Sequence, residues 1–111
     1  LSPMFRGILS TIYLDLKQEM SIYKVYNLLK KFYKNDRFVK VLNINSLVST
    51  NDVINTNYCN ISICKTEYKN KIIILSAIDN LIKGGSGQAV QNMNILFGYK
   101  SDEGLNWWEY W

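Results

Sequence analysis

Apolar positions along the chain follow the two-residue period of strands in some stretches and the three-to-four-residue period of helices in others. Residues 5–17 are rich in β-branched and aromatic side chains and predict one long strand. Behind Ser21, which has the character of a helix N-cap, apolar residues recur at helical spacing. These residues are Ile22, Val25, Tyr26, Leu29, Phe32 and Tyr33. The spacing predicts an amphipathic helix that lies on a sheet and ends at Asn35-Asp36.

The second half of the chain predicts a short strand, a hairpin and a second helix. The short strand covers residues 38–42, and the hairpin joins residues 58–65 to residues 71–78 through a turn at 68–70. An unbroken apolar run within residues 72–75 indicates burial on both faces of its strand. An apolar helical stripe then follows a glycine-rich segment and stops at Gly98. Its members are Ala89, Val90, Met93, Leu96 and Phe97. Strands interleaved with two packed helices predict an α+β domain.

Composition and charge narrow the function classes. A chain of 111 residues, 48% of them hydrophobic, fits a single domain with one core. The net charge of +4 is a mild excess, densest at Lys30, Lys31 and Lys34. This lysine cluster is compatible with a solvated helix face or, alternatively, with a nucleic-acid surface, but nucleic-acid binders usually show a stronger basic patch. We therefore expect no nucleic-acid partner. We expect no membrane segment either, because no apolar run approaches about 20 residues.

The cysteines and the absence of histidine argue against metal sites and catalysis within the chain. Cys59 and Cys64 lie five positions apart in one predicted strand, so their side chains point to opposite faces and do not pair. With no histidine, neither a Ser–His nor a Cys–His pair can form. The chain therefore predicts no catalytic residue, no metal site and a reducing, cytoplasmic setting.

The glycine-rich segment Gly84-Gly85-Ser86-Gly87 is the first candidate binding feature. It joins a buried strand to a helix, where free N–H groups and close backbone approach suit an anion or a carboxamide. Alternatively, its glycines merely supply positive φ angles in a loop. It matches neither a Walker loop nor the Gly-x-Gly-x-x-Gly dinucleotide pattern.

Arg6, at the start of the long strand, is the second candidate. A guanidinium group fixed at this point could hold a carboxylate or a phosphate through two parallel hydrogen bonds. The alternative is a surface salt bridge of little energetic weight.

Three segments together resemble one enzyme family. Residues 3–9 read Pro-Met-Phe-Arg-Gly-Ile-Leu, residues 57–61 read Asn-Tyr-Cys-Asn-Ile, and residues 76–94 carry Asp-Asn-Leu-Ile-Lys-Gly followed by Gly-Gln-Ala-Val-Gln-Asn-Met-Asn. Their order and spacing are similar to those of N-acetyl-gamma-glutamyl-phosphate reductases. The resemblance covers residues 1–105.

The resemblance implies an NADPH-dependent enzyme of arginine biosynthesis that reduces an acyl phosphate to N-acetylglutamate semialdehyde. It implies a mixed, largely antiparallel sheet with helices packed on one face, as in the C-terminal domain of glyceraldehyde-phosphate-dehydrogenase-type reductases. Arg6 is then expected to bind substrate. The residues expected to border the NADP cofactor are Asn80, Lys83, Gly84, Gly85, Gly87 and Gln88. Cys59 is expected in a structural strand, not as the nucleophile.

Three features of the family pattern are missing from this sequence, and we expect them in another part of the protein. The nucleophilic cysteine, the acid/base histidine and the dinucleotide fingerprint of the family have no counterpart in this sequence. We therefore expect residues 1–105 to be part of a C-terminal substrate and dimerisation domain that is inactive alone, and that works with its own N-terminal Rossmann domain in a homo-oligomer. Residues 106–111 form an atypical Trp-rich tail. The alternative function is a stand-alone, noncatalytic dimerisation module.

Overall fold

The computed structural model, which describes residues 2–110, contains one four-stranded sheet with the order β1-β4-β3-β2. The strands are β1 (Ile8–Asp15), β2 (Val39–Val41), β3 (Cys59–Lys65) and β4 (Lys71–Ile78). β1 and β3 both pair antiparallel with β4, while β2 pairs parallel with β3. This confirms the predicted α+β class with a mixed, largely antiparallel sheet. The hairpin and the strand over residues 71–78 are also confirmed.

Helix α1 (Ile22–Phe32) packs on one face of the sheet, as its apolar spacing predicts. The side chain of Ser21 accepts a hydrogen bond from the Lys24 N–H and so caps the first turn. Ile22 meets Ile63 and Ile72 in the main core cluster. The half-buried side chains packed around this cluster are Leu16, Val25, Tyr26, Leu29, Ile44 and Ile74.

The opposite face of β3 is covered by the segment between β2 and β3. The hydroxyl of Ser62 donates to the Ser46 carbonyl at 2.7 Å, and Val53 of this segment is fully buried. The segment includes a short 3₁₀ turn, η1 (Thr50–Asp52). Ser62 on this inner strand is thus buried with a hydrogen-bond partner supplied by a connecting segment, whereas the Oδ1 of buried Asn60 has no partner among the described residues.

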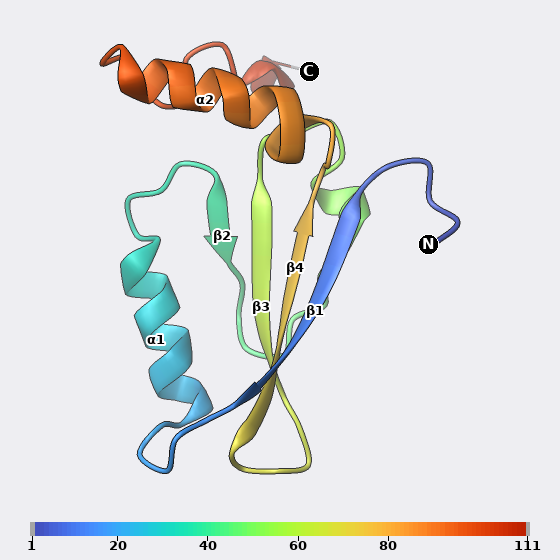
Figure 1. Cartoon of the computed structure of the whole chain (residues 1–111), viewed down its shortest axis with the longest axis vertical. Helices are drawn as coiled ribbons and strands as arrows, with labels where there is room; N and C mark the ends of the chain where they lie inside the picture. Colours follow the sequence, from blue (N-terminus) through green and yellow to red (C-terminus); the bar gives the residue numbers. More distant parts are fainter. Residues whose placement is uncertain (1, 111) are drawn as a thin grey trace.

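β1 is an edge strand that neither helix covers (Figure 1). Its apolar residues alternate between the two faces, and both sets are exposed. Because β1 is uncovered, the central residues Ile73, Ile74 and Leu75 of β4 are only half-buried. The prediction that this run is buried on both faces is therefore met only in part. The exposed apolar residues of β1 are therefore accessible to another protein surface.

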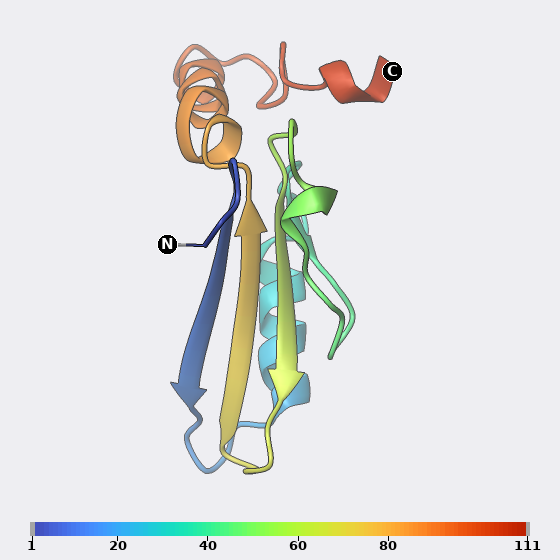
Figure 2. The ribbon, with the colours of Figure 1, turned by 90° about the vertical axis from the view of Figure 1, so that its right-hand side faces the viewer.

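Helix α2 (Gly87–Leu96) lies across one end of the sheet, above the last residues of β4 (Figure 1 and Figure 2). A π-helical turn, η2 (Ile82–Ser86), leads into α2, with a kink at Gly85. A 3₁₀ turn, η3 (Trp107–Tyr110), follows near the same end. Its Trp108 packs edge-on against Phe38 and Tyr58, so the described part of the Trp-rich tail is docked on the domain.

Candidate functional site

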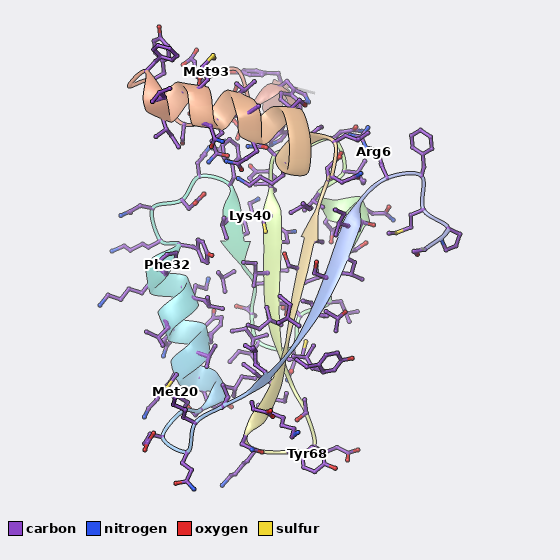
Figure 3. All side chains as sticks on the ribbon, in the orientation of Figure 1. Arg6, Met20, Phe32, Lys40, Tyr68 and Met93 are labelled. Carbon is purple, nitrogen blue, oxygen red and sulfur yellow. The ribbon has the colours of Figure 1, made fainter. Side chains whose placement is uncertain are left out.

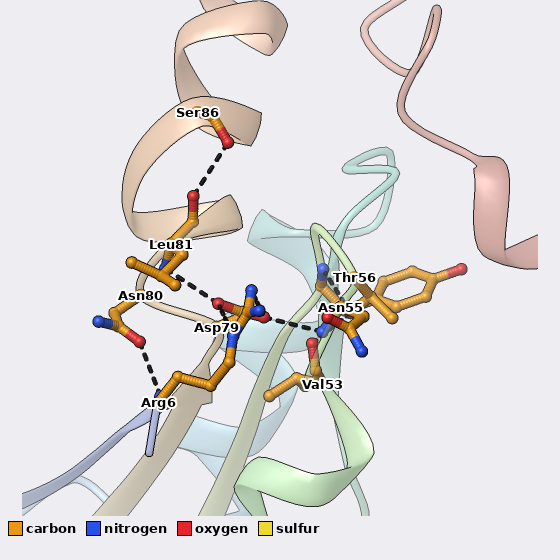
Figure 4. A network of polar contacts seen from close by, with 10 residues as sticks. Arg6, Val53, Asn55, Thr56, Asp79, Asn80, Leu81 and Ser86 are labelled. Carbon is orange, nitrogen blue, oxygen red and sulfur yellow. Dashed lines mark hydrogen bonds and ion pairs between the residues drawn. The ribbon is translucent and has the colours of Figure 1, made fainter. Parts of the chain in front are cut away.

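The end of the sheet below α2 is organised around Asp79, the residue that follows β4. Asp79 is fully buried and lies against Arg6, with its Oδ2 2.6 Å from Arg6 Nη2 and its Oδ1 3.3 Å from Arg6 Nε (Figure 4). The backbone N–H groups of Asn55 and Leu81 donate to the same carboxylate at 2.8 and 2.9 Å. One carboxylate therefore joins the start of β1, the end of β4 and the segment before β3.

Two opposing effects determine the pKa of Asp79. Burial disfavours the carboxylate and would raise the pKa, but the hydrogen bonds from Asn55, Arg6 and Leu81 outweigh burial and lower the pKa below its ordinary value. Asp79 is therefore ionised at neutral pH. The φ angle of 64° at Asn55 is one that asparagine tolerates better than most residues, and this backbone conformation accompanies the hydrogen bond from its N–H to Asp79.

Arg6 is thus neither free nor engaged in a simple surface salt bridge. Nε and Nη2 face Asp79, while the side chain borders a hollow of about 530 Å³. The other residues around this hollow are Met4, Phe5, Thr50, Asn51 and Ile54. Asp79 thus orients the guanidinium group through two of its three nitrogens, and Nη1 is the one that does not bind Asp79. The substrate-binding role of Arg6 stays a prediction.

The glycine-rich segment divides into an exposed and a buried part. Gly84, Gly85 and Ser86 are exposed, and the Ser86 hydroxyl donates to the Leu81 carbonyl at 2.9 Å. Gly87 is buried with a φ of −64°, and a Cβ at this position would lie 2.3 Å from Asn57 Oδ1. None of the glycines in this segment has a positive φ, so that interpretation is wrong. Gly87 is required for close packing, whereas Gly84 and Gly85 offer an open backbone.

Asn80 and Lys83 are both half-buried and hydrogen-bonded within the protein. Asn80 Oδ1 accepts a hydrogen bond from the Gly7 N–H at 2.7 Å, which fixes the start of β1 beside the turn. Lys83 Nζ donates to Gln91 Oε1 at 2.8 Å, and the same oxygen accepts from Asn57 Nδ2 at 3.0 Å. Burial lowers the pKa of Lys83, partly offset by the negative charge of Asp36. The hydrogen bonds of both side chains hold the turn in place.

Gln88 remains half-buried at the start of α2, where its amide donates to Asn92 Oδ1 at 2.9 Å. Of the six residues expected to border a cofactor, Gly84 and Gly85 are exposed, Asn80, Lys83 and Gln88 are half-buried, and Gly87 is buried. The structure brings all six and Arg6 to the same end of the sheet. Arg6 lines a hollow, and none of the six residues expected to border a cofactor lines the same hollow.

The polar residues on the buried side of α2 also belong to this end of the sheet, and the sequence analysis did not identify them. Gly87, Gln91 and Asn94 are buried, and the Asn94 amide donates to the carbonyls of Ser101 and Glu103. Their spacing of four and three positions is a helical face of its own, as regular as the apolar stripe. That polar spacing could have indicated which side of α2 meets the protein.

Arg37 forms a second polar cluster at this end that the sequence did not indicate. Its guanidinium group contacts Asp102 at 3.1 Å, Tyr58 at 3.0 Å and Glu109. These contacts fasten residues 102–109 to the strand end. Leu105 is buried and Trp108 packs against Phe38, so residues on both sides of the compositional change at residues 105–106 contact the domain.

Among residues 2–110 there is no group of three or more acidic, cysteine or histidine side chains arranged to hold a metal ion. Both cysteines in that range are free, on strand positions of opposite parity. None of the helices described is long and apolar enough to cross a membrane.

A mixed four-stranded sheet with an exposed apolar edge strand defines an α+β domain with a surface suited to contact with another protein. The chain belongs to the family described as semialdehyde dehydrogenase, dimerisation domain, whose pattern matches residues 1–80.

Curated relatives of the chain are reductases. It is 50% identical over 106 residues to the N-acetyl-gamma-glutamyl-phosphate reductase of Thermoanaerobacter pseudethanolicus, 49% over 107 residues to that of Brachyspira hyodysenteriae and 47% over 106 residues to that of Clostridium botulinum. Each match covers 96% of this chain. The chain spans only about a third of the length of these relatives, 31, 30 and 31% respectively. The resemblance stated from the three motifs is thereby confirmed.

Proposed function

We propose that this chain is the C-terminal substrate and subunit-contact part of an NADPH-dependent N-acetyl-gamma-glutamyl-phosphate reductase, acting in cytoplasmic arginine biosynthesis. The observation that carries the proposal is 50% identity over 96% of the chain to such a reductase. The ordered cluster of Arg6, Asp79 and the exposed Gly84-Gly85 turn supports it. The reactive cysteine and histidine belong to the part of the reductase outside this chain.

In this function, residues of this chain would bind and orient the substrate and the cofactor. Arg6, held by Asp79, would present its outer nitrogen to an anionic group of the acyl phosphate. Gly84 and Gly85 have no side chain, so a ligand could approach the backbone of η2 closely. These residues fit one wall of a NADP site, with the rest supplied by a Rossmann domain. NADPH would supply the hydride that reduces the acyl group.

A chimera tests this function directly. The matching 106-residue segment of the Thermoanaerobacter pseudethanolicus reductase would be replaced by this chain. We expect the chimera to oxidise NADPH in the presence of N-acetylglutamyl phosphate, and the 111-residue chain alone to show no turnover. Within the chimera, Arg6→Lys keeps the charge but loses the planar fork, so KM should rise at least about tenfold. Lys24→Arg, a similar exchange on α1, serves as the matched control.

Rapid turnover by the isolated chain, or a folded chimera without turnover, would each contradict the proposal. If the KM of Arg6→Lys equals that of the unsubstituted chimera, Arg6 does not bind the substrate. The urea midpoint of each variant separates loss of binding from loss of folding.

A noncatalytic dimerisation module is the second candidate, favoured by the exposure of β1. Ile8, Ile12 and Leu14 lie on one face of β1 at 45, 43 and 38% exposure, next to half-buried Ile74 and Ile78 of β4. A contiguous apolar face of this kind on an edge strand is typical of a protein contact. We infer that a second copy of the chain packs against it, in the reductase or in a stand-alone module.

A charge on this face should therefore separate the subunits. Ile12→Asp would place a carboxylate, desolvated by the second copy, at the centre of the contact. We expect the dimer to dissociate, with at least about a hundredfold weaker association by analytical ultracentrifugation. Leu28→Asp, on exposed α1, should leave association unchanged. An Ile12→Asp protein that dimerises as tightly as the parent would place the contact elsewhere.

A further inference from the structure

The Trp-rich tail makes a specific aromatic contact with the domain. Its 3₁₀ turn η3 lies near the end of the sheet that α2 crosses (Figure 2). The ring of half-buried Trp108 packs edge-on against Phe38 and Tyr58, at centroid distances of 6.1 and 5.1 Å. At the other end of the turn, Tyr110 is 78% exposed. Trp108 is therefore the side chain through which the tail reaches the domain interior.

Arg37 holds the tail in this position. Its three guanidinium nitrogens have three different partners, which are Asp102 at 3.1 Å, the Tyr58 hydroxyl at 3.0 Å and Glu109 of η3. Lys40 of β2, labelled in Figure 3, places its ammonium group 3.8 Å from the centroid of the Tyr58 ring. A planar guanidinium group that binds three partners fixes them relative to one another. The tail is thereby joined to the ends of β2 and β3.

The ring of Phe38 connects the tail contact with Lys83. Phe38 is fully buried and packs against Trp108. Lys83 Nζ lies 5.4 Å from the centroid of the Phe38 ring, a distance at which an aromatic ring attracts an ammonium group. The same ammonium group donates to Gln91 Oε1 at 2.8 Å. Phe38 and Gln91 therefore define where the charge of Lys83 lies.

The position of Lys83 bears on the glycine-rich turn. Lys83 directly precedes the exposed Gly84-Gly85 pair in η2, and Gln91, which accepts its hydrogen bond, is buried in α2. The ammonium group thus links the turn to the helix that follows it. Because side chains in a protein interior are closely packed, a ring that moves leaves space that its neighbours fill. Loss of the tail contact would therefore let Phe38 shift, and Lys83 and the turn would shift with it.

We propose that the tail is a positioning element of the turn that borders the cofactor, with Trp108 holding Phe38 and Phe38 in turn holding Lys83. The proposal rests on the proposed function, because it places Lys83 and the Gly84-Gly85 turn at the NADP site. Trp108 itself touches no ligand and acts through the two residues between it and the turn.

An NMR measurement on the 111-residue chain tests whether the tail acts on Lys83. The ring current of Phe38 displaces the Hε signals of Lys83 from those of exposed lysines, and their loss in Lys83→Met identifies them. We expect Trp108→Ala to reduce this displacement by about half or more, because the ring no longer keeps its place beside the ammonium group. Trp108→Phe keeps an aromatic ring and should retain the displacement. Tyr110→Ala, on the exposed side of η3, is the matched control and should retain it as well.

Kinetics of the chimera test whether this positioning serves the cofactor. Trp108→Ala should raise the KM for NADPH at least about fivefold and change kcat less than about twofold, because the turn is displaced while the reacting groups lie elsewhere. In the Lys83→Met background, Trp108→Ala should not raise this KM further, since residues that act through one contact are not additive. Trp108→Leu keeps part of the apolar volume and replaces Trp108→Ala in both experiments if the urea midpoint shows that the alanine variant does not fold.

The outcomes separate this proposal from the proposed function. Lys83 signals that stay in place in a folded Trp108→Ala or Trp108→Leu chain would overturn the positioning role, and so would equal movement in Tyr110→Ala. Additive effects of Trp108→Ala and Lys83→Met on the KM for NADPH would show that the tail does not act through Lys83. NADPH turnover of the unsubstituted chimera reports on the proposed function, while the NMR signals of the chain alone do not depend on activity.

Discussion

Replacing Asp79 with alanine should lower the free energy of unfolding by about 3 kcal/mol or more, the range expected when one partner of a buried ion pair is removed. The change leaves Arg6 without its carboxylate and leaves the N–H groups of Asn55 and Leu81 without their acceptor. Urea unfolding followed by circular dichroism measures the loss. Asp15→Ala breaks only the exposed pair with Lys71 and should cost less than about 1 kcal/mol.

The pH dependence of stability gives an independent check on Asp79. Its pKa is lower in the folded than in the unfolded chain, so its stabilisation is complete above the ordinary aspartate value of about 4 and is lost as the pH falls through the folded-state pKa. Asp79→Asn should remove this acid-dependent part. A variant whose urea midpoint falls between pH 5 and 3 as steeply as that of the parent would assign the acid sensitivity to other carboxylates.

Replacing Gly87 with alanine should destabilise the chain by about 2 kcal/mol or more, because the new methyl group overlaps atoms that cannot move freely. It would lie 2.3 Å from Asn57 Oδ1 and 2.7 Å from both Cγ2 and the backbone oxygen of Ile82. Asn57 is fully buried and hydrogen-bonded to Gln91, so a shift would disturb the inner side of α2. Urea unfolding again measures the effect.

Gly84→Ala is the matched control for this substitution. Its Cβ would meet Ile78 Cδ1, the end of a flexible side chain, at 3.2 Å. We expect a change of less than about 1 kcal/mol. Equal losses in both variants would mean that general turn flexibility, and not the contact with Asn57, explains the glycine at position 87.

The strand and helix pattern was predictable because local spacing and burial agree over most of the chain. Ser21 caps α1 as expected, and Lys71–Ile78 forms β4 at the predicted boundaries. The long strand proposed for residues 5–17 is shorter in the structure, since Arg6 and Gly7 are engaged with Asp79 and Asn80. The Gly7 N–H donates to the Asn80 side chain, so it is not available for a hydrogen bond to the neighbouring strand, and β1 begins only at Ile8.

The direction of α2 was not predictable from hydrophobicity. The stripe containing Met93 and Leu96 suggests a buried side by the ordinary rule, yet the structure buries the side containing Gln91 and Asn94. The spacing of residues shows which of them share a side of a helix. It does not show which side packs against the rest of the domain. The placement of α2 across the end of the sheet depends on Lys83 and on Asn57, and Asn57 lies 34 positions before its partner Gln91 in the sequence.

The sequence indicated that Arg6 and the glycine-rich segment lie at the same end of the sheet, but not the contacts that each makes. Their places next to β1 and β4, which pair antiparallel, imply this shared end. The sequence could not show that Asp79 would take up two nitrogens of Arg6, because the pairing joins residues 73 positions apart. It also could not show which hydrogen bonds Asn80 and Lys83 would make.

The pairing of β1 with β4 also affects the order in which the chain can fold. Partners in this ladder are 56 to 70 positions apart, whereas β3 and β4 are joined by a tight turn. Closing a long loop before any contact is made is entropically unfavourable, so the β3–β4 hairpin should form early and β1 should add late. During synthesis the ribosome would therefore release an apolar, unpaired β1 well before its partner strand β4 exists, and β1 would stay exposed until β4 is made.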